Sequence, residues 1–305
     1  YHLNNRMDEA NAAISLAMEY NPEAVGPMLY KAREAIETKD YDTAEKYAQK
    51  VEPLDSLEAV YLRAELMVIK EDIDSADGLL LEYSKDVPTD EYKDVVKGVV
   101  QLYLDYNQFI KAFEWIARTD GANTEGFKKL MAQTMFGLGK FKDSEKLFNE
   151  LLDKNPYSSE YWNALAGVQY MNEDYSSALT SSEYALAINP ADANSLVSKA
   201  NTLYTMKNYD DALVYFQKYC EKKPDDEFGF YHQGLCLMNK GKYEESLELF
   251  KKAISIAPID SIYLPDIYCE TAFAYSKTDN LDQALWCPSM TEQLDCDHTN
   301  ILVMK

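Results

Sequence analysis

The chain of 305 residues carries 52 Asp and Glu against 30 Lys and Arg, which gives a formal net charge of −22. So acidic a protein is a poor nonspecific ligand for nucleic acid or for an anionic membrane, because basic side chains bind both. No apolar run is long enough to cross a membrane, and no basic segment followed by an apolar run indicates a secretory leader.

In chain order, the recurring feature is a large apolar residue followed three positions later by Ala or Ser. Successive copies lie 32 to 38 residues apart. Self-similarity at such a period is typical of proteins built from stacked repeats. The copies begin at Met7, Tyr41, Ile73, Phe109, Phe141, Tyr175, Tyr209, Tyr243 and Leu281.

Each copy predicts two antiparallel helices joined by a turn, because the intervening apolar residues are spaced by three and four. Asp40, Asp174, Asn208 and Asn280 each precede a large apolar residue directly. Their side chains suit a helix N-cap, which accepts a hydrogen bond from a free backbone N–H. Proline closes the second helix in several copies, since it is poorly placed inside a helix. These prolines, each 15 residues after the large apolar residue, are Pro22, Pro88, Pro156, Pro190, Pro224 and Pro258.

A second small residue lies nine positions before most copies of the large apolar residue. Small side chains let two helices approach closely, so Ala166 is expected to face Ala178. Val100, before Phe109, is the one exception to the small side chain. The small residues are Ala32, Ala64, Ala132, Ala166, Ala200, Gly234 and Ala272.

This pattern resembles the tetratricopeptide repeat. In the best copy, Ser182 replaces the middle Phe of the family pattern, whereas neighbouring copies keep Phe148, Phe216 and Phe250 there. The resemblance implies an all-α fold, a right-handed superhelical α-solenoid of antiparallel helix pairs. The best copy reads Trp162, Leu165, Ala166, Tyr175, Ala178, Ala185 and Pro190.

We expect a single solenoid over residues 1–305, since each repeat of such an array contacts only its neighbours. The chain begins and stops in mid-repeat, which suggests a segment of a longer array or a processed chain. Pro288 lies in the second helix of the last complete repeat and should break it, at a cost of about 3 kcal/mol. The expected units are a half-repeat at 1–24, complete repeats at 25–56, 57–92, 93–124, 125–158, 159–192, 193–226, 227–264 and 265–298, and a partial repeat at 299–305.

The sequence predicts no enzyme site and no cofactor. It contains no Gly-rich phosphate loop, no His-Glu-x-x-His and no Gly-x-Ser-x-Gly. His232 and Cys236 lie four apart on a predicted helix, but two ligands are too few for a structural zinc site, so packing is favoured. The densest group of potential ligands, at 295–298, is a weak metal candidate. Five scattered cysteines read as reduced thiols and favour the cytoplasm, with a periplasmic or exported location still open.

The resemblance implies a concave groove lined by the first helix of each repeat. Amides there can hydrogen-bond a peptide backbone, lysines can meet a carboxylate, and tyrosines offer area with a polar tip. We therefore expect an extended peptide or protein segment, including an acidic residue, to bind along this strip. The alternative is ordinary polar lining with no fixed ligand. The candidates are Lys97, Gln101, Lys129, Gln133, Asn163, Tyr170, Asn201, Tyr204 and Tyr231.

Three functions remain in view from the sequence. The first is a non-enzymatic scaffold or adaptor for protein–protein interaction. The second is the regulatory or targeting portion of a larger enzyme or sensor protein. The third, an RNA-binding helical repeat, is disfavoured by the acidity and by the uneven repeat length. The sequence leaves the partner's identity and the oligomeric state open.

Overall fold

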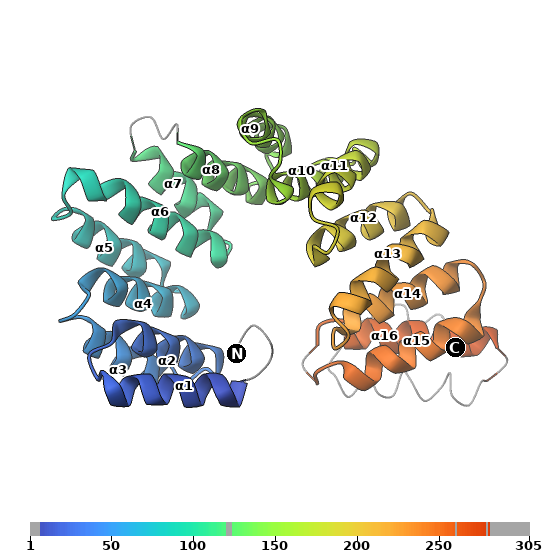
Figure 1. Ribbon diagram of the computed structural model, residues 1–305, viewed down its shortest axis with the longest axis horizontal. Coiled ribbons are helices and arrows are strands. Elements are labelled where there is room, and N and C mark those ends of the chain that lie inside the picture. Colours follow the sequence, from blue (N-terminus) through green and yellow to red (C-terminus); the bar gives the residue numbers. More distant parts are fainter. Residues whose placement is uncertain (1–6, 120–123, 260, 279, 281–305) are drawn as a thin grey trace. The chain divides into compact units, whose positions relative to one another are not determined.

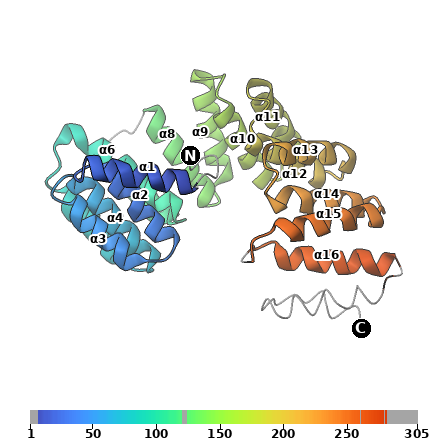
Figure 2. The same ribbon diagram turned by 60° about the horizontal axis from the view of Figure 1, so that its bottom comes forward.

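The computed structural model describes residues 7–119, 124–259, 261–278 and 280. Within these residues it contains sixteen α-helices and no strand, so the predicted all-α fold is confirmed. Successive helices lie side by side in chain order within each part of the chain (Figures 1 and 2). No helix of the described ranges is both long enough and apolar enough to span a bilayer.

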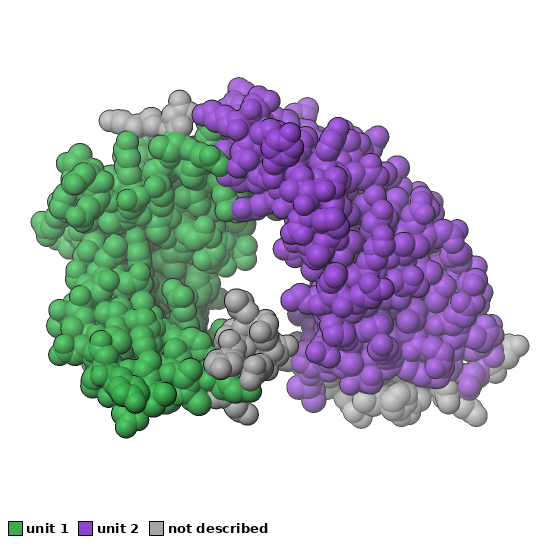
Figure 3. All heavy atoms as spheres, in the orientation of Figure 1, with its two compact units in different colours: residues 1–140 green, residues 141–305 purple. Residues whose placement is uncertain are grey.

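The chain divides into two compact units, residues 1–140 and residues 141–305, which are described separately (Figure 3). Unit 1 contains α1 (Met7–Tyr20), α2 (Val25–Glu37), α3 (Tyr41–Val51), α4 (Ser56–Ile69), α5 (Ile73–Ser84), α6 (Thr89–Asp105), α7 (Phe109–Ala117) and α8 (Glu125–Gly137). Unit 2 contains α9 (Phe141–Lys154), α10 (Ser159–Met171), α11 (Tyr175–Ile188), α12 (Ala193–Thr205), α13 (Tyr209–Lys222), α14 (Glu227–Asn239), α15 (Tyr243–Ile256) and α16 (Leu264–Lys277).

The second helix of every described repeat begins at the large apolar residue that the sequence pattern singled out. Where Asp or Asn precedes that residue, the capping side chain fixes the start of the helix. Asp40 and Asp174 each accept a hydrogen bond, 3.1 Å long, from the backbone N–H three residues on. This is the N-cap contact that satisfies one of the free donors of a helix end. Leu281 and Pro288, in the last predicted repeat, lie outside the described residues.

The small residues lie where the two helices of a repeat cross. Ala166 on α10 and Ala178 on α11 are both buried, and these two helices pack together. Gly234 occupies the same position on α14, and a Cβ added there would lie 2.4 Å from the Phe250 ring. A Cβ therefore has no room at this crossing of α14, and the equivalent positions of the other repeats, apart from Val100, hold nothing larger than Ala.

The turn inside each repeat has a feature that the sequence analysis did not identify. The residue two positions before each second helix of α3 to α15 adopts a positive φ, between 57° and 76°. The N–H of the following residue then bonds the carbonyl five residues back, as Asp40 does to Ala35 at 2.8 Å. This double-bonded helix end is the Schellman motif. The positive-φ residues are Lys39, Glu71, Asn107, Gly139, Glu173, Lys207 and Gly241.

Two polar clusters hold unit 1 together across helices. Asp77 on α5 is buried and accepts hydrogen bonds from Trp115 Nε1 at 2.7 Å and from Lys111 Nζ at 3.0 Å. Burial opposes the ionisation of Asp77, but these hydrogen bonds outweigh it and hold its pKa below the ordinary value. A charged hub thus joins α5 to α7 inside the core.

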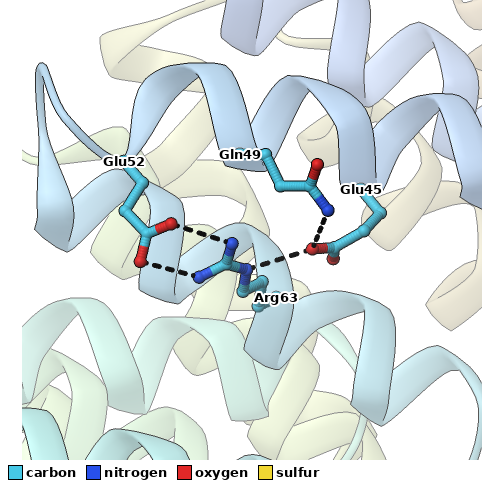
Figure 4. Close-up of polar contacts among 4 residues, drawn as sticks. All are labelled: Glu45, Gln49, Glu52 and Arg63. Atoms are coloured by element: carbon cyan, nitrogen blue, oxygen red, sulfur yellow. Dashed lines mark hydrogen bonds and ion pairs between the residues drawn. The ribbon is translucent and has the colours of Figure 1, made fainter.

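The second cluster centres on Arg63 of α4 (Figure 4). Its guanidinium binds both carboxylate oxygens of Glu52 at 3.0 Å, and its Nε donates to Glu45 at 3.2 Å. Gln49 donates to the same Glu45 oxygen at 3.3 Å. This bidentate contact, which also lowers the pKa of Glu52, ties α3 to the first helix of the next repeat.

Candidate binding surface

The nine candidate residues lie on the first helices of their repeats, four in unit 1 and five in unit 2. We call the surface around Lys97, Gln101, Lys129 and Gln133, on α6 and α8, the unit 1 face. We call the surface around Asn163, Tyr170, Asn201, Tyr204 and Tyr231, on α10, α12 and α14, the unit 2 face. Helix α6 contacts α8, and α10 contacts α12, so each face is built from neighbouring helices.

On the unit 1 face, two candidate side chains already have partners on their own helix. Lys97 Nζ lies 2.7 Å from Asp94 Oδ1, and Gln101 Nε2 donates to Asp105 at 2.7 Å. The Lys97 ammonium also lies 5.6 Å from the centre of the Phe127 ring. An exposed ion pair of this kind contributes at most about 1 kcal/mol, so an incoming carboxylate can displace Asp94.

Gln133 is the candidate on the unit 1 face whose hydrogen bonding is incomplete. Its Oε1 is buried and has no hydrogen-bond partner in the described part of the chain. Leaving such an acceptor unmatched costs about 1–3 kcal/mol. Lys129 lies one turn earlier on α8 and is half-buried.

On the unit 2 face, most candidates bond to the next first helix. Asn163 Oδ1 accepts from Ser198 Oγ at 2.8 Å, and the Tyr170 hydroxyl lies 2.9 Å from Thr205 Oγ1. One repeat further on, Asn239 Nδ2 donates to the Tyr204 hydroxyl at 3.0 Å. All three pairs are 35 residues apart, one repeat plus one residue. The contacts form a polar ladder along α10, α12 and α14.

The partners in this ladder, Ser198, Thr205 and Asn239, were not among the residues predicted from the sequence. The 35-residue spacing is the signal that could have found them. Asn201 lies between the rungs on α12, is half-buried, and makes no hydrogen bond with a described residue. Its amide is therefore available to a ligand.

Tyr231 differs from the other tyrosines of the unit 2 face because it is buried, with 8% of its surface exposed. Its ring centre lies 6.1 Å from that of Phe250 and 6.3 Å from that of Tyr263. Tyr170 and Tyr204 are half-buried, and each meets the first tyrosine of the following second helix edge to face.

The predicted packing pair, His232 and Cys236, lies inside unit 2. The centre of the His232 ring lies 4.0 Å from that of Phe228, with the rings tilted by 32°, and Nδ1 lies 2.9 Å from the Phe228 carbonyl oxygen. Burial lowers the pKa of His232. Cys236 is fully buried, which raises the pKa of its thiol to about 12. No group of three or more potential metal ligands occurs within the described ranges, and residues 295–298 lie outside them.

Comparison with known proteins agrees with this architecture. A tetratricopeptide-repeat family model matches residues 130–193, and a second one of the same description matches residues 228–260. The chain is a tetratricopeptide-repeat (TPR) protein. The first match spans two of the predicted TPR units, and the second falls within the predicted unit at 227–264.

Solved TPR structures share the fold at low sequence identity. MamA from Desulfovibrio magneticus RS-1, residues 41 to the end, is 17% identical, with a TM-score of 0.53. The match covers 58% of this chain and 97% of that one. YrrB, described as a TPR protein with an unusual peptide-binding site, is 19% identical with a TM-score of 0.50, covering 64% of this chain and 96% of that one.

One curated relative is an enzyme by name. The human protein O-mannosyl-transferase TMTC1 is 21% identical over 157 residues. The match covers 50% of this TPR chain but only 18% of the human protein. The chain therefore spans less than a fifth of the length of that relative.

Proposed function

We propose that this TPR protein is a non-enzymatic scaffold or adaptor that binds an extended segment of a protein partner along the first helices. The observation that carries the proposal is that each face keeps a polar group with no partner among the described residues, Gln133 Oε1 in unit 1 and the Asn201 amide in unit 2. An extended backbone offers alternating donors and acceptors that match such groups. The peptide-binding site named for YrrB supports this choice among TPR functions.

The unit 1 face suits a segment with an acidic residue. Lys97 and Lys129 occupy equivalent positions in adjacent repeats. When a ligand carboxylate replaces that of Asp94, the Lys97 ammonium still has a negatively charged partner. Such an exchange loses little, because Asp94 remains hydrated when released. The alternative, that the polar residues only link repeats, applies best to Asn163, Tyr170 and Tyr204, whose polar atoms are already paired.

A peptide-array screen with the intact chain tests the proposal. The wild type should retain a set of peptides enriched in Asp or Glu, and the double variant K97E/K129E should lose that enrichment. The control is K46E/K50E, an equal change in charge at two exposed positions on α3. Unchanged binding by K97E/K129E would remove the lysines from the account, and a chain that retains no peptide at all would overturn the proposal.

The second candidate function is the regulatory or targeting portion of a larger enzyme or sensor protein. The match to part of TMTC1 favours it, since that protein carries a similar region within a longer chain. Sequencing the complete reading frame decides between the two functions, because a catalytic domain in the same chain would favour the second.

Two further parts of the proposal concern what the protein meets in the cell. We propose that it does not bind nucleic acid, which a gel shift with mixed RNA over a salt series would test. We also propose a cytoplasmic location, with which the free thiols of Cys220 and Cys236 are consistent, and which cell fractionation would test.

A further inference from the structure

The spacing of the polar ladder points to a pair of residues at the end of the unit 2 face. Asn163 lies three positions before the small residue Ala166, and its partner Ser198 lies two positions before Ala200. The equivalent positions on α14 and α16 are Tyr231, three before Gly234, and Glu270, two before Ala272. Helices α14 and α16 are in contact, so the register of the Asn163–Ser198 pair assigns Tyr231 and Glu270 to facing positions of these two helices.

Neither member of this pair has a hydrogen-bond partner in the part of the chain that the structure describes. Tyr231 is 8% exposed and its ring is fixed by Phe250 and Tyr263, yet its hydroxyl makes no hydrogen bond with a described residue. Glu270 is half-buried and has no hydrogen bond or ion pair within the described ranges. Buried tyrosine hydroxyls and carboxylates are usually paired, because removing them from water without a partner is costly.

The pKa shifts of Tyr231 and Glu270 agree with this placement. Burial, followed by the charge of Asp266 one turn earlier on α16, raises the pKa of Glu270. Glu270 in turn contributes, after burial, to the raised pKa of the hydroxyls of both Tyr231 and Tyr204. Tyr204 on α12, Tyr231 on α14 and Glu270 on α16 are thus close enough for the Glu270 charge to act on both hydroxyls.

From this geometry we infer that Tyr231 and Glu270 form a subsite for an ammonium group of the partner chain. The ammonium would donate to the Glu270 carboxylate and to the Tyr231 hydroxyl oxygen, which completes both groups at once. Such a pair lies in a partly desolvated setting, where a charge-assisted hydrogen bond is stronger than in water. The net charge of −22 also favours the approach of a cation.

The inference rests on the proposed function, since it places one end of the partner segment on the unit 2 face. A lysine side chain and a free N-terminal amine share the required chemistry, so the experiment includes both.

The test uses small probes and the intact chain, so it does not depend on finding a peptide. Nα-acetyl-lysine methylamide supplies a side-chain ammonium, alanine methylamide an α-ammonium, and the Nα,Nε-diacetyl-lysine methylamide is neutral. Chemical shifts of ¹³C-labelled tyrosine rings report on Tyr231, whose signal is assigned with Y231F. The variant is E270Q, and the control is E244Q, which removes one negative charge from an exposed position on α15.

We expect the Tyr231 signal to shift and saturate with one or both ammonium probes and not with the neutral one. E270Q should weaken that binding at least about tenfold, because it removes one partner of a desolvated charge pair, while E244Q should not. Thermal melting should show E270Q to be at least as stable as the wild type, since its amide is neutral when buried.

Two results would overturn the inference: equal shifts with the neutral probe, or ammonium binding that E270Q leaves unchanged. Absence of any shift with either ammonium probe would do the same. None of these results bears on the peptide-array outcome, so the subsite can fail while the scaffold function stands. Peptide capture without a preference for Lys or for a free N-terminus would also count against the subsite alone.

Discussion

Replacing Asp77 with Ala tests the buried hub of unit 1. The change leaves Trp115 Nε1, now bonded at 2.7 Å, and the Tyr103 hydroxyl, bonded at 3.3 Å, without an acceptor. Both residues are fully buried, so neither group can turn to water. An unmatched buried donor costs about 1–3 kcal/mol, and the longer bond counts for less.

We therefore expect D77A to lower the free energy of unfolding of this part of the chain by roughly 2–4 kcal/mol. Lys111 adds little to this figure, because its ammonium is partly exposed and can be hydrated. Repeat arrays unfold segment by segment, so hydrogen exchange of the amides in α5, α6 and α7 is the appropriate measurement.

The control is D74A, which replaces an exposed Asp one turn earlier on α5. It should change the free energy of local unfolding, measured by exchange, by less than about 0.5 kcal/mol. D77N, which keeps an acceptor for Trp115, should fall between D77A and the wild type. If D77A and D74A have equal effects below about 1 kcal/mol, the hub does not stabilise these helices and the reasoning is wrong.

Three further predictions concern the repeats and pH. A178L should destabilise unit 2 by about 1–3 kcal/mol through overpacking at the crossing of α10 and α11. The control A187L, on the exposed side of α11, should not destabilise it. Urea titration followed by circular dichroism measures both effects. Lys207 and Gly241 both have a positive φ, which glycine adopts without the steric cost that a Cβ brings. K207G should therefore raise the free energy of unfolding by up to about 1 kcal/mol, and G241A should lower it by about 1–2 kcal/mol. Effects of the same sign would contradict this. The pKa of Asp77 is lowered on folding, so its ionised carboxylate contributes fully to the free energy of unfolding above the ordinary pKa of 3.8. This contribution is lost as pH falls through the pKa of the folded state. Hydrogen exchange in α5, followed as pH is lowered, should show the loss in the wild type but not in D77N.

From the pattern of large apolar and small residues, the sequence predicts the positions at which helices begin and at which they cross. Tyr175 and Ala178 show why: one residue starts the helix after a capping Asp, and the other is fully buried on the helix that packs against α10. Both effects act within one repeat, so they recur in the sequence at the repeat spacing and can be recognised there.

Contacts between repeats were harder to predict. Ser198, Thr205 and Asn239 resemble ordinary surface residues until the register between neighbouring first helices is known. Asp77 is one of three acidic residues of α5, and its partners come from two other helices, so no local pattern marks it. The positive-φ turns escaped notice because five of the seven use Lys, Glu or Asn in place of Gly.

The central claim is that a partner segment binds along the first helices, and Asn201 tests it most directly. The measurement is the affinity of the intact chain for the strongest peptide from the array, by titration calorimetry, for N201A and for the exposed control N194A on the same helix. We predict a loss of about three- to tenfold for N201A, the value of one hydrogen bond, and no loss for N194A. Equal affinities for N201A, N194A and the wild type would contradict the claim.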